Sequence, residues 1–89
     1  MDRFEGIRAF VAVVDAGSFT AAGQRLGISI KLVSKYVAAL EQLQGVTLLN
    51  RTTRSLSLTL AGERYLVAAR RVLEAVEELD ASPMPMRAC

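Results

Sequence analysis

Hydroxyl and ammonium side chains gather on one short stretch in the middle of the sequence. A helix is predicted there, and the outward positions of its first half are Ser29, Ile30, Lys31, Ser34 and Lys35. Hydroxyl groups and the free backbone N–H groups of a helix start are suited to phosphate oxygens. Lys31 is placed to read a base edge, because lysine can donate to O6 or N7 of guanine. Ile30 could pack on a thymine methyl or tuck under the preceding helix. The pattern favours contact with the phosphates and bases of a nucleic acid.

A second polar cluster, Arg51-Thr52-Thr53-Arg54, lies between two extended segments. Its two guanidiniums and two hydroxyls would project at the tip of a hairpin. Arginine is suited to phosphate contacts and to narrow minor grooves. An ordinary solvated turn is the alternative, and the basic helix nearby favours a binding role.

The formal net charge is only +2, but the charges are sorted along the chain. Positions 25–54 hold five basic residues and one acid, Glu41, which gives +4. Positions 72–80 hold four acids and no base, which gives −4. A basic middle beside an acidic end is expected of a chain whose middle meets a polyanion, although ordinary surface charge can produce the same arrangement.

Residue types exclude several kinds of chemistry. The 89 residues include no histidine and one cysteine, Cys89, so a Ser–His dyad, a thiol–imidazole pair, a Cys/His zinc site and an intrachain disulfide are ruled out. There is no glycine-rich phosphate loop and no plausible carboxylate pair, so we expect no enzyme, cofactor or metal. The longest apolar run, positions 9–14, is far too short to span a membrane, and acidic Asp2 and Glu5 stand where a secretory signal is positively charged. We expect a cytoplasmic binding domain.

The elements that would position these residues follow from hydrophobic periodicity and from capping residues. Helices are predicted over 3–16, 19–26, 29–44 and 60–79, and extended segments over 46–50 and 55–59. Gly17, Gly27 and Gly45 would end helices, whereas Ser18, Ser29 and Thr59 would begin them. The order predicts a mainly α fold, a winged helix-turn-helix of three helices and a two-stranded wing over 1–59. A linker helix over 60–80 and a flexible tail over 81–89 would follow.

The corner between the second and third helices carries the strongest local signal. Ala21, Ala22 and Gly23 have small side chains, which let another helix cross closely. Gly27 permits a positive φ in the turn, and Ile28 and Val33 would fill the corner. This is the helix-turn-helix layout, in which the second helix enters the major groove. A plain helical hairpin in a small bundle is the alternative.

The last helix carries an apolar seam at spacings of four, three, four and three. Its residues are Tyr65, Ala69, Val72, Val76 and Leu79. Two heptads are too few to predict a coiled coil by themselves. So small a domain cannot easily cover so long an apolar helix, which favours dimerisation through it. The alternative is that the seam packs back on its own domain.

An ordered set of motifs runs through most of the chain. It comprises Phe10-Val11-Ala12-Val13-Val14, Gly17-Ser18-Phe19-Thr20-Ala21-Ala22, Leu26-Gly27-Ile28-Ser29, Val33-Ser34, Leu40-Glu41, Gly45-Val46, Leu48, Arg51-Thr52-Thr53-Arg54, Leu58-Thr59 and Ala61-Gly62. This set resembles the LysR-type transcriptional regulators, over their N-terminal winged helix-turn-helix and the linker helix that follows it.

The resemblance implies a bacterial regulator that binds double-stranded DNA at a dyad-symmetric site and dimerises through its linker helix, with a tetramer as the alternative if the chain is part of a longer protein. Residues 29–44 would be the recognition helix and residues 51–54 the wing, on the backbone or in the minor groove. Ser18 and Thr20 would help to hold phosphates, Ser34 and Lys35 would contact the backbone and nearby bases, and Arg54 would reach from the wing. A winged-helix module that binds proteins instead of DNA is the alternative function.

Three positions depart from the family pattern. Ile30 and Lys31 replace a frequent Gln-Pro pair, which removes any base preference that could be carried over. Gly23 replaces a usual alanine, at a cost of about 0.5–1 kcal/mol for a glycine inside a helix. Leu49 replaces a frequent aromatic residue, so the core beneath the wing would be filled differently. Members normally continue into a large effector-binding domain, which this sequence lacks, so it is either a DNA-binding piece of a longer protein or a naturally short one.

Overall fold

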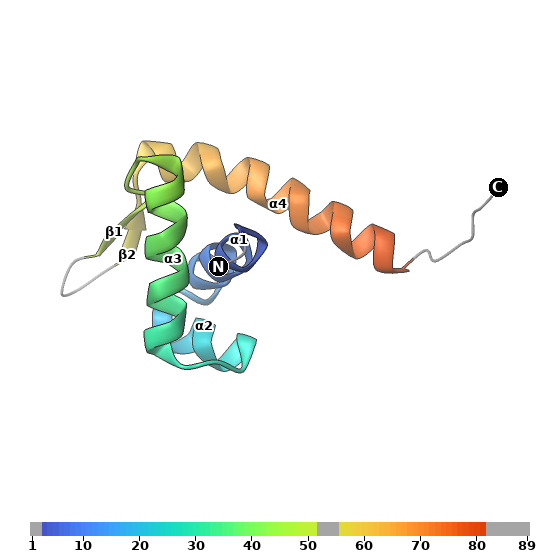
Figure 1. Ribbon diagram of the computed structural model, residues 1–89, viewed down its shortest axis with the longest axis horizontal. Helices are drawn as coiled ribbons and strands as arrows, with labels where there is room; N and C mark the ends of the chain where they lie inside the picture. Colours follow the sequence, from blue (N-terminus) through green and yellow to red (C-terminus); the bar gives the residue numbers. More distant parts are fainter. Residues whose placement is uncertain (1–2, 52–55, 82–89) are drawn as a thin grey trace.

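The computed structural model describes residues 3–51 and 56–81 of the chain (Figure 1). The described elements are α1 (Arg3–Ala16), α2 (Phe19–Leu26), α3 (Ile30–Gln44), β1 (Leu49–Arg51), β2 (Leu56–Leu58) and α4 (Leu60–Ala81). Helices dominate, and β1 and β2 form one antiparallel pair. The predicted mainly α, winged helix-turn-helix fold is confirmed. The wing residues Thr52, Thr53 and Arg54 and the predicted tail beyond Ala81 lie outside the described residues.

The starts of α2 and α3 and the ends of α1, α2 and α3 fall where the capping residues predict, whereas α4 continues to Ala81, beyond the predicted end at position 79. Ser18 Oγ accepts a hydrogen bond from Ala21 N at 3.0 Å, and Ser29 Oγ accepts one from Leu32 N at 3.1 Å. Each bond satisfies a backbone N–H that has no partner inside its helix. Gly27 follows α2 with a φ of 72°, a left-handed conformation that residues with a Cβ rarely adopt. These local contacts set the short turn that separates α2 from α3.

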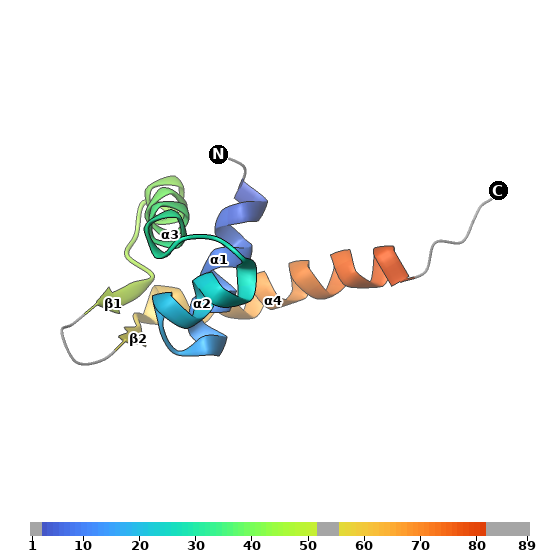
Figure 2. The ribbon, with the colours of Figure 1, turned by 90° about the horizontal axis from the view of Figure 1, so that it is seen from below.

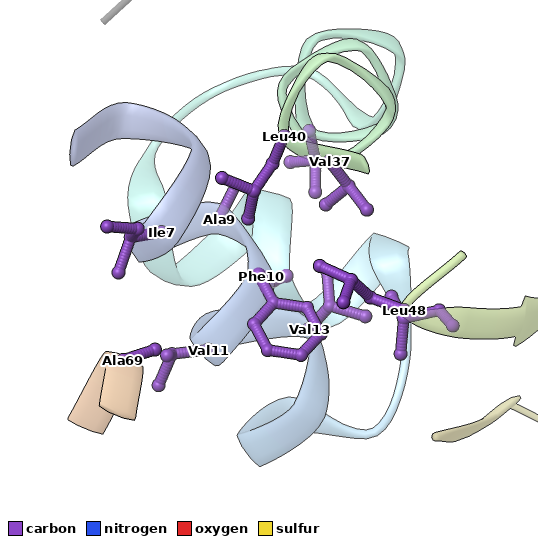
Figure 3. Packing of buried hydrophobic residues seen from close by; sticks show 12 residues of the cluster. Ile7, Ala9, Phe10, Val11, Val13, Val37, Leu40, Leu48 and Ala69 are labelled. Carbon is purple, nitrogen blue, oxygen red and sulfur yellow. The ribbon is translucent and has the colours of Figure 1, made fainter. Parts of the chain in front are cut away.

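The hydrophobic core lies around α1, which packs against α2, α3 and α4 (Figures 1 and 3). The largest side chains with less than 2% of their surface exposed are Phe10, Val13, Val33, Val37, Leu40 and Leu48. Figure 3 shows Phe10 and Val13 between the α3 residues Val37 and Leu40 and the segment that carries Leu48. Burying a side chain of this size stabilises a fold by about 1.5–3 kcal/mol. The core therefore fixes α3 and the start of the wing relative to α1.

The turn between α2 and α3 requires a glycine at position 23. A Cβ added there would lie 2.8 Å from the carbonyl oxygen of Ile28, and Ile28 N donates to Gly23 O at 3.0 Å. The predicted close crossing of the two helices is therefore present. A glycine at position 23 lowers the helix propensity of α2. A larger residue there would obstruct the close contact with the turn at Ile28.

The two strands are shorter than the sequence indicates. Residues 46–48 are not in a strand, and β1 begins at Leu49, which pairs with Leu58. The reason is that the backbone of Leu48 has other partners: its N–H donates to Glu41 Oε2 at 2.8 Å, and its carbonyl accepts from Thr59 N at 3.0 Å. Leu49 itself is 3% exposed and belongs to the core beneath the wing.

The first half of α4 packs on α1, which corrects part of the predicted dimer seam. Ala69 is 2% exposed and lies in the core beside Val11 (Figure 3). The Tyr65 ring meets the edge of Phe10, with centroids 5.8 Å apart and planes at 68°. Tyr65 and Ala69, the first two residues of the predicted seam, therefore pack against α1 of their own domain. Val72 and Leu79 are exposed, and Val76 is half-buried.

Candidate nucleic-acid interface

The first half of α3 presents its basic residues to solvent. Lys31 and Lys35 are exposed and Ile30 is 49% exposed, whereas Val33 and Val37 are completely buried on the opposite side of the helix. Figures 1 and 2 place α3 and the two strands at one end of the molecule, away from the last turns of α4. The structure therefore leaves this helix face open to a large partner. Ile30, for which packing on a thymine methyl and tucking under the preceding helix are the alternatives, keeps about half of its surface exposed.

The serines predicted to hold phosphates are also the residues that cap helices. Ser18 and Ser29 each accept a backbone N–H through Oγ, which leaves the hydroxyl hydrogen available to donate to an incoming oxygen. Thr20 is exposed in the first turn of α2. All three residues lie at helix N-termini, where partial positive charge favours an anion. Their arrangement suits phosphate oxygens.

Arg51 joins the wing to both helices of the helix-turn-helix. Its guanidinium carbon lies 4.8 Å from the centre of the Phe19 ring. Nη1 makes a long hydrogen bond of 3.5 Å to Ser34 Oγ, and Nη2 lies 3.7 Å from Glu41 Oε1. The Arg51 side chain is 39% exposed, so part of the guanidinium still faces solvent. This geometry gives Arg51 a role in positioning the wing that its sequence context did not reveal.

Glu41 is the residue that sequence reasoning missed. In the sequence it is the lone acid in a basic stretch and part of the Leu40-Glu41 motif, and neither observation assigns it a role. In the structure, Glu41 Oε2 accepts hydrogen bonds from Leu48 N at 2.8 Å and Leu49 N at 3.1 Å. This one carboxylate attaches the end of α3 to the beginning of β1. A single acid within an otherwise basic segment was the signal in the sequence that Glu41 has a structural role.

Charges that are separated in sequence are also separated in space. Lys31 and Lys35 are exposed on α3, at the end of the molecule that carries the strands (Figure 2). Residues 72–80 of α4 carry four acids, all exposed: Glu74, Glu77, Glu78 and Asp80. They lie on the half of α4 that extends away from α3 (Figure 1). A polyanion would therefore be attracted to the end of the molecule that carries α3 and repelled from the opposite end.

The described part of the chain contains no helix with the length and apolar character that crossing a bilayer requires.

Comparison with known proteins places this architecture in a family. Residues 4–63 match the family described as "Bacterial regulatory helix-turn-helix protein, lysR family". An HTH-type transcriptional repressor of Pseudomonas aeruginosa strain UCBPP-PA14 is 48% identical over 82 residues, which is 92% of this chain and 26% of that protein. The HTH-type transcriptional activator AaeR of Escherichia coli K12 is 43% identical over 79 residues, 89% of this chain and 26% of AaeR. The chain thus spans about a quarter of the length of these curated relatives.

A solved structure agrees with the sequence comparison. The crystal structure of a CbnR_DBD–DNA complex superposes with a TM-score of 0.82 at 38% identity, covering 91% of this chain and 92% of the other. The likeness therefore extends over the winged helix-turn-helix and α4 together. Because the family match covers more than half of the residues, this chain belongs to the LysR family of bacterial regulatory helix-turn-helix proteins.

Proposed function

We propose that this chain binds double-stranded DNA sequence-specifically, as the DNA-binding part of a LysR-type transcriptional regulator in the bacterial cytoplasm. The observation that carries the proposal is the exposed first half of α3, where Lys31 and Lys35 project away from a core that holds the opposite face. A helix of this kind fits the major groove of B-DNA. The likeness to a solved DNA complex and to named transcriptional regulators supports the same role. The role is one of binding rather than of enzymatic reaction.

Each residue of the interface has a task in this proposal. Lys31 reads a base edge and Ile30 packs on a thymine methyl, while Ser34 and Lys35 contact the backbone and nearby bases. The phosphates are held at the starts of α2 and α3 by Ser18, Thr20 and Ser29. Arg51 supports the wing, and Thr52, Thr53 and Arg54 extend it to the backbone or the minor groove.

Selection of bound duplexes from a random pool tests the proposal directly. We expect a dyad-symmetric motif and an affinity that falls steeply as salt rises, because lysine and arginine contacts release counterions from DNA. Enrichment of no motif, together with an affinity that is flat in salt, would contradict it.

The role of Lys31 has its own test. Lys31→Ala should relax the preference at one base position by about 1–3 kcal/mol while other positions keep theirs. The matched comparison is Arg54→Ala, which should weaken binding to all sequences and reduce the salt dependence. A selected motif unchanged by Lys31→Ala would show that Lys31 does not read a base.

We also propose that α4 forms a homodimer, through a seam revised by the structure. The exposed apolar positions on one side of α4 are Ala68, Val72, Ala75 and Leu79, at spacings of four, three and four. That spacing forms a continuous stripe along a helix and is the one that pairs two helices. The stripe lies beside the inward residues Tyr65 and Ala69, so a partner helix can bind while α4 keeps its contacts with α1.

The charges of α4 favour an antiparallel arrangement of the two helices. Residues 60–71 of α4 carry three arginines, Arg64, Arg70 and Arg71, and one acid, Glu63, whereas residues 72–80 carry four acids and no base. A parallel pair would bring the two acidic ends together. An antiparallel pair brings each acidic end to the basic half of its partner, and it sets Ala68 opposite Leu79 and Val72 opposite Ala75. Small residues then face larger ones along the seam.

Sedimentation of a charged variant tests the dimer. Val72→Glu places a carboxylate in the proposed seam and should shift the chain to monomer mass. Val67→Glu is the matched control, because Val67 is 55% exposed and lies about 140° around the helix from Val72. Equal masses for Val72→Glu and the wild type would exclude the seam.

A twofold dimer would present its two α3 helices to major grooves about 34 Å apart, or a multiple of that distance.

A further inference from the structure

A bidentate salt bridge joins α1 to α4 at the molecular surface. Arg70 Nη2 donates to Asp15 Oδ1 at 2.6 Å, and Arg70 Nη1 donates to Asp15 Oδ2 at 3.2 Å. The two residues are 55 positions apart in the sequence. Two parallel hydrogen bonds between a guanidinium and a carboxylate fix the relative orientation of both groups. The contact therefore constrains an angle between two helices as well as a distance.

This contact affects the orientation of α4 relative to α1 more than the free energy of unfolding. The side chains of Arg70 and Asp15 are 43% and 37% exposed. Exposed ion pairs contribute little to the free energy of unfolding, because solvent screens them. The buried contacts of Tyr65 and Ala69 with α1 already hold the first half of α4 in the fold. The ion pair follows directly after Ala69 and so restrains rotation of α4 about those apolar contacts.

The pair lies where α4 begins to leave the body of the domain. From Arg70, α4 continues for 11 residues to Ala81, a length of about 16 Å. Figure 1 shows this part of α4 extending past α1. A tilt of about 10° near Arg70 would displace the end of the helix by about 3 Å, close to the rise of one base pair. A small change at the ion pair is therefore large enough to matter for DNA geometry.

We propose that Asp15 and Arg70 are positioning residues that hold α4 at the angle setting the half-site spacing accepted by the dimer. This inference rests on the proposed function, because spacing has a meaning only for two chains on one DNA site. The seam lies mainly beyond Arg70, so the orientation of α4 relative to α3 is transmitted to the partner's recognition helix. Neither residue touches DNA in this arrangement. Their substitution should change which half-site spacing the dimer selects.

The experiment uses the full 89-residue chain and a library of duplexes. Each duplex carries the two selected half-sites with the spacer shortened or lengthened in single base-pair steps. The chains compared are the wild type, Asp15→Asn, Arg70→Gln and the reciprocal double variant Asp15→Arg with Arg70→Asp. The matched control is Glu5→Gln, which also converts a carboxylate of α1 to an amide.

We expect the wild type and Glu5→Gln to select one spacing. Asp15→Asn and Arg70→Gln should lower the discrimination between adjacent spacings by about two- to five-fold, the effect that an exposed pair can supply. The preferred bases within each half-site should stay unchanged, and the melting temperature should fall only slightly, because an exposed ion pair contributes little to the free energy of unfolding. The double variant should regain the discrimination, which a general loss of structure would not allow.

The failures of the two proposals can be told apart. A wild type that selects a fixed spacing, and an Asp15→Asn variant that keeps it with equal discrimination, would overturn the positioning role alone. A double variant that stays as indiscriminate as the single variants would do the same. A wild type that enriches no duplex would overturn the proposed DNA binding, and the positioning role with it.

Discussion

Replacing Glu41 by alanine should destabilise the domain through two backbone groups that it leaves without a partner. Glu41 Oε2 accepts from the N–H groups of Leu48 and Leu49, at 2.8 and 3.1 Å. Those residues are 0% and 3% exposed. A buried N–H that loses its acceptor costs about 1–3 kcal/mol. The Glu41 side chain is itself 18% exposed, so water can reach the vacated position.

The lower end of that range applies to each N–H, which gives a loss of about 2 kcal/mol in the free energy of unfolding. For a domain of this size, such a loss lowers the melting temperature by about 8–16 °C. Thermal unfolding followed by circular dichroism measures the shift, and amide hydrogen exchange at Leu48 and Leu49 should accelerate in the variant.

Two further variants separate the hydrogen bonds from other effects. Glu41→Gln keeps one oxygen that can accept both N–H groups but removes the charge, so it should lose less stability than Glu41→Ala. Gln42→Ala makes a similar truncation at the next, exposed position of α3 and should melt close to the wild type. Equal melting temperatures for Glu41→Ala and Gln42→Ala, or a Glu41→Gln variant that is the least stable of the three, would contradict this prediction.

Two other predictions follow from contacts within the domain. Gly62→Ala should lower the free energy of unfolding by about 1–3 kcal/mol, because the added Cβ would overlap the Leu48 carbonyl oxygen. Gly6→Ala, whose added Cβ would lie 3.2 Å from Leu40 Cβ and 3.3 Å from the Tyr36 carbonyl oxygen, makes tight contacts without the overlap at Gly62, so it should lose less in denaturant unfolding, and a reversed order would contradict the geometry. The hydrogen bonds from Arg70 hold the pKa of Asp15 below its ordinary value of 3.8, with a smaller contribution from Arg25. Because the pKa is lower in the folded chain, the stability that Asp15 supplies is fully present above pH 3.8 and is lost as the pH falls through the folded-state pKa. An NMR titration in which the Asp15 pKa fails to rise in Arg70→Gln would show that Arg70 is not the cause.

Local sequence determined most of the secondary structure of this protein. The boundaries of α2 and α3 depend on groups within a few residues of each other, such as the Ser29 hydroxyl and the Leu32 N–H, or on a glycine that accepts a positive φ at position 27. The buried side of α3 was equally readable, because Val33, Val37 and Leu40 recur at the helical period and are all completely buried. The exposed side, with Lys31 and Lys35, followed as its complement.

The family resemblance supplied what periodicity left open. Spacing alone was compatible with a helical hairpin in a small bundle, and the match of residues 4–63 to the LysR family resolved the choice. The positions that depart from the usual pattern were identified in the sequence, but their consequences were not. At Gly23 the consequence is a carbonyl of the following turn, 2.8 Å from where a Cβ would stand.

Only the tertiary structure decided the features that depend on partners distant in sequence. The partners of Leu48 come from Glu41 and Thr59, which shorten the first strand, and those of Arg51 come from α2 and α3. The seam of α4 shows the same limit, because one apolar stripe on a helix can face its own domain or another chain. Packing against Phe10 and Val11 turned Tyr65 and Ala69 inward and left the neighbouring stripe exposed. A helix encodes its apolar face in its sequence, but the orientation of that face depends on the surfaces that the rest of the chain brings together.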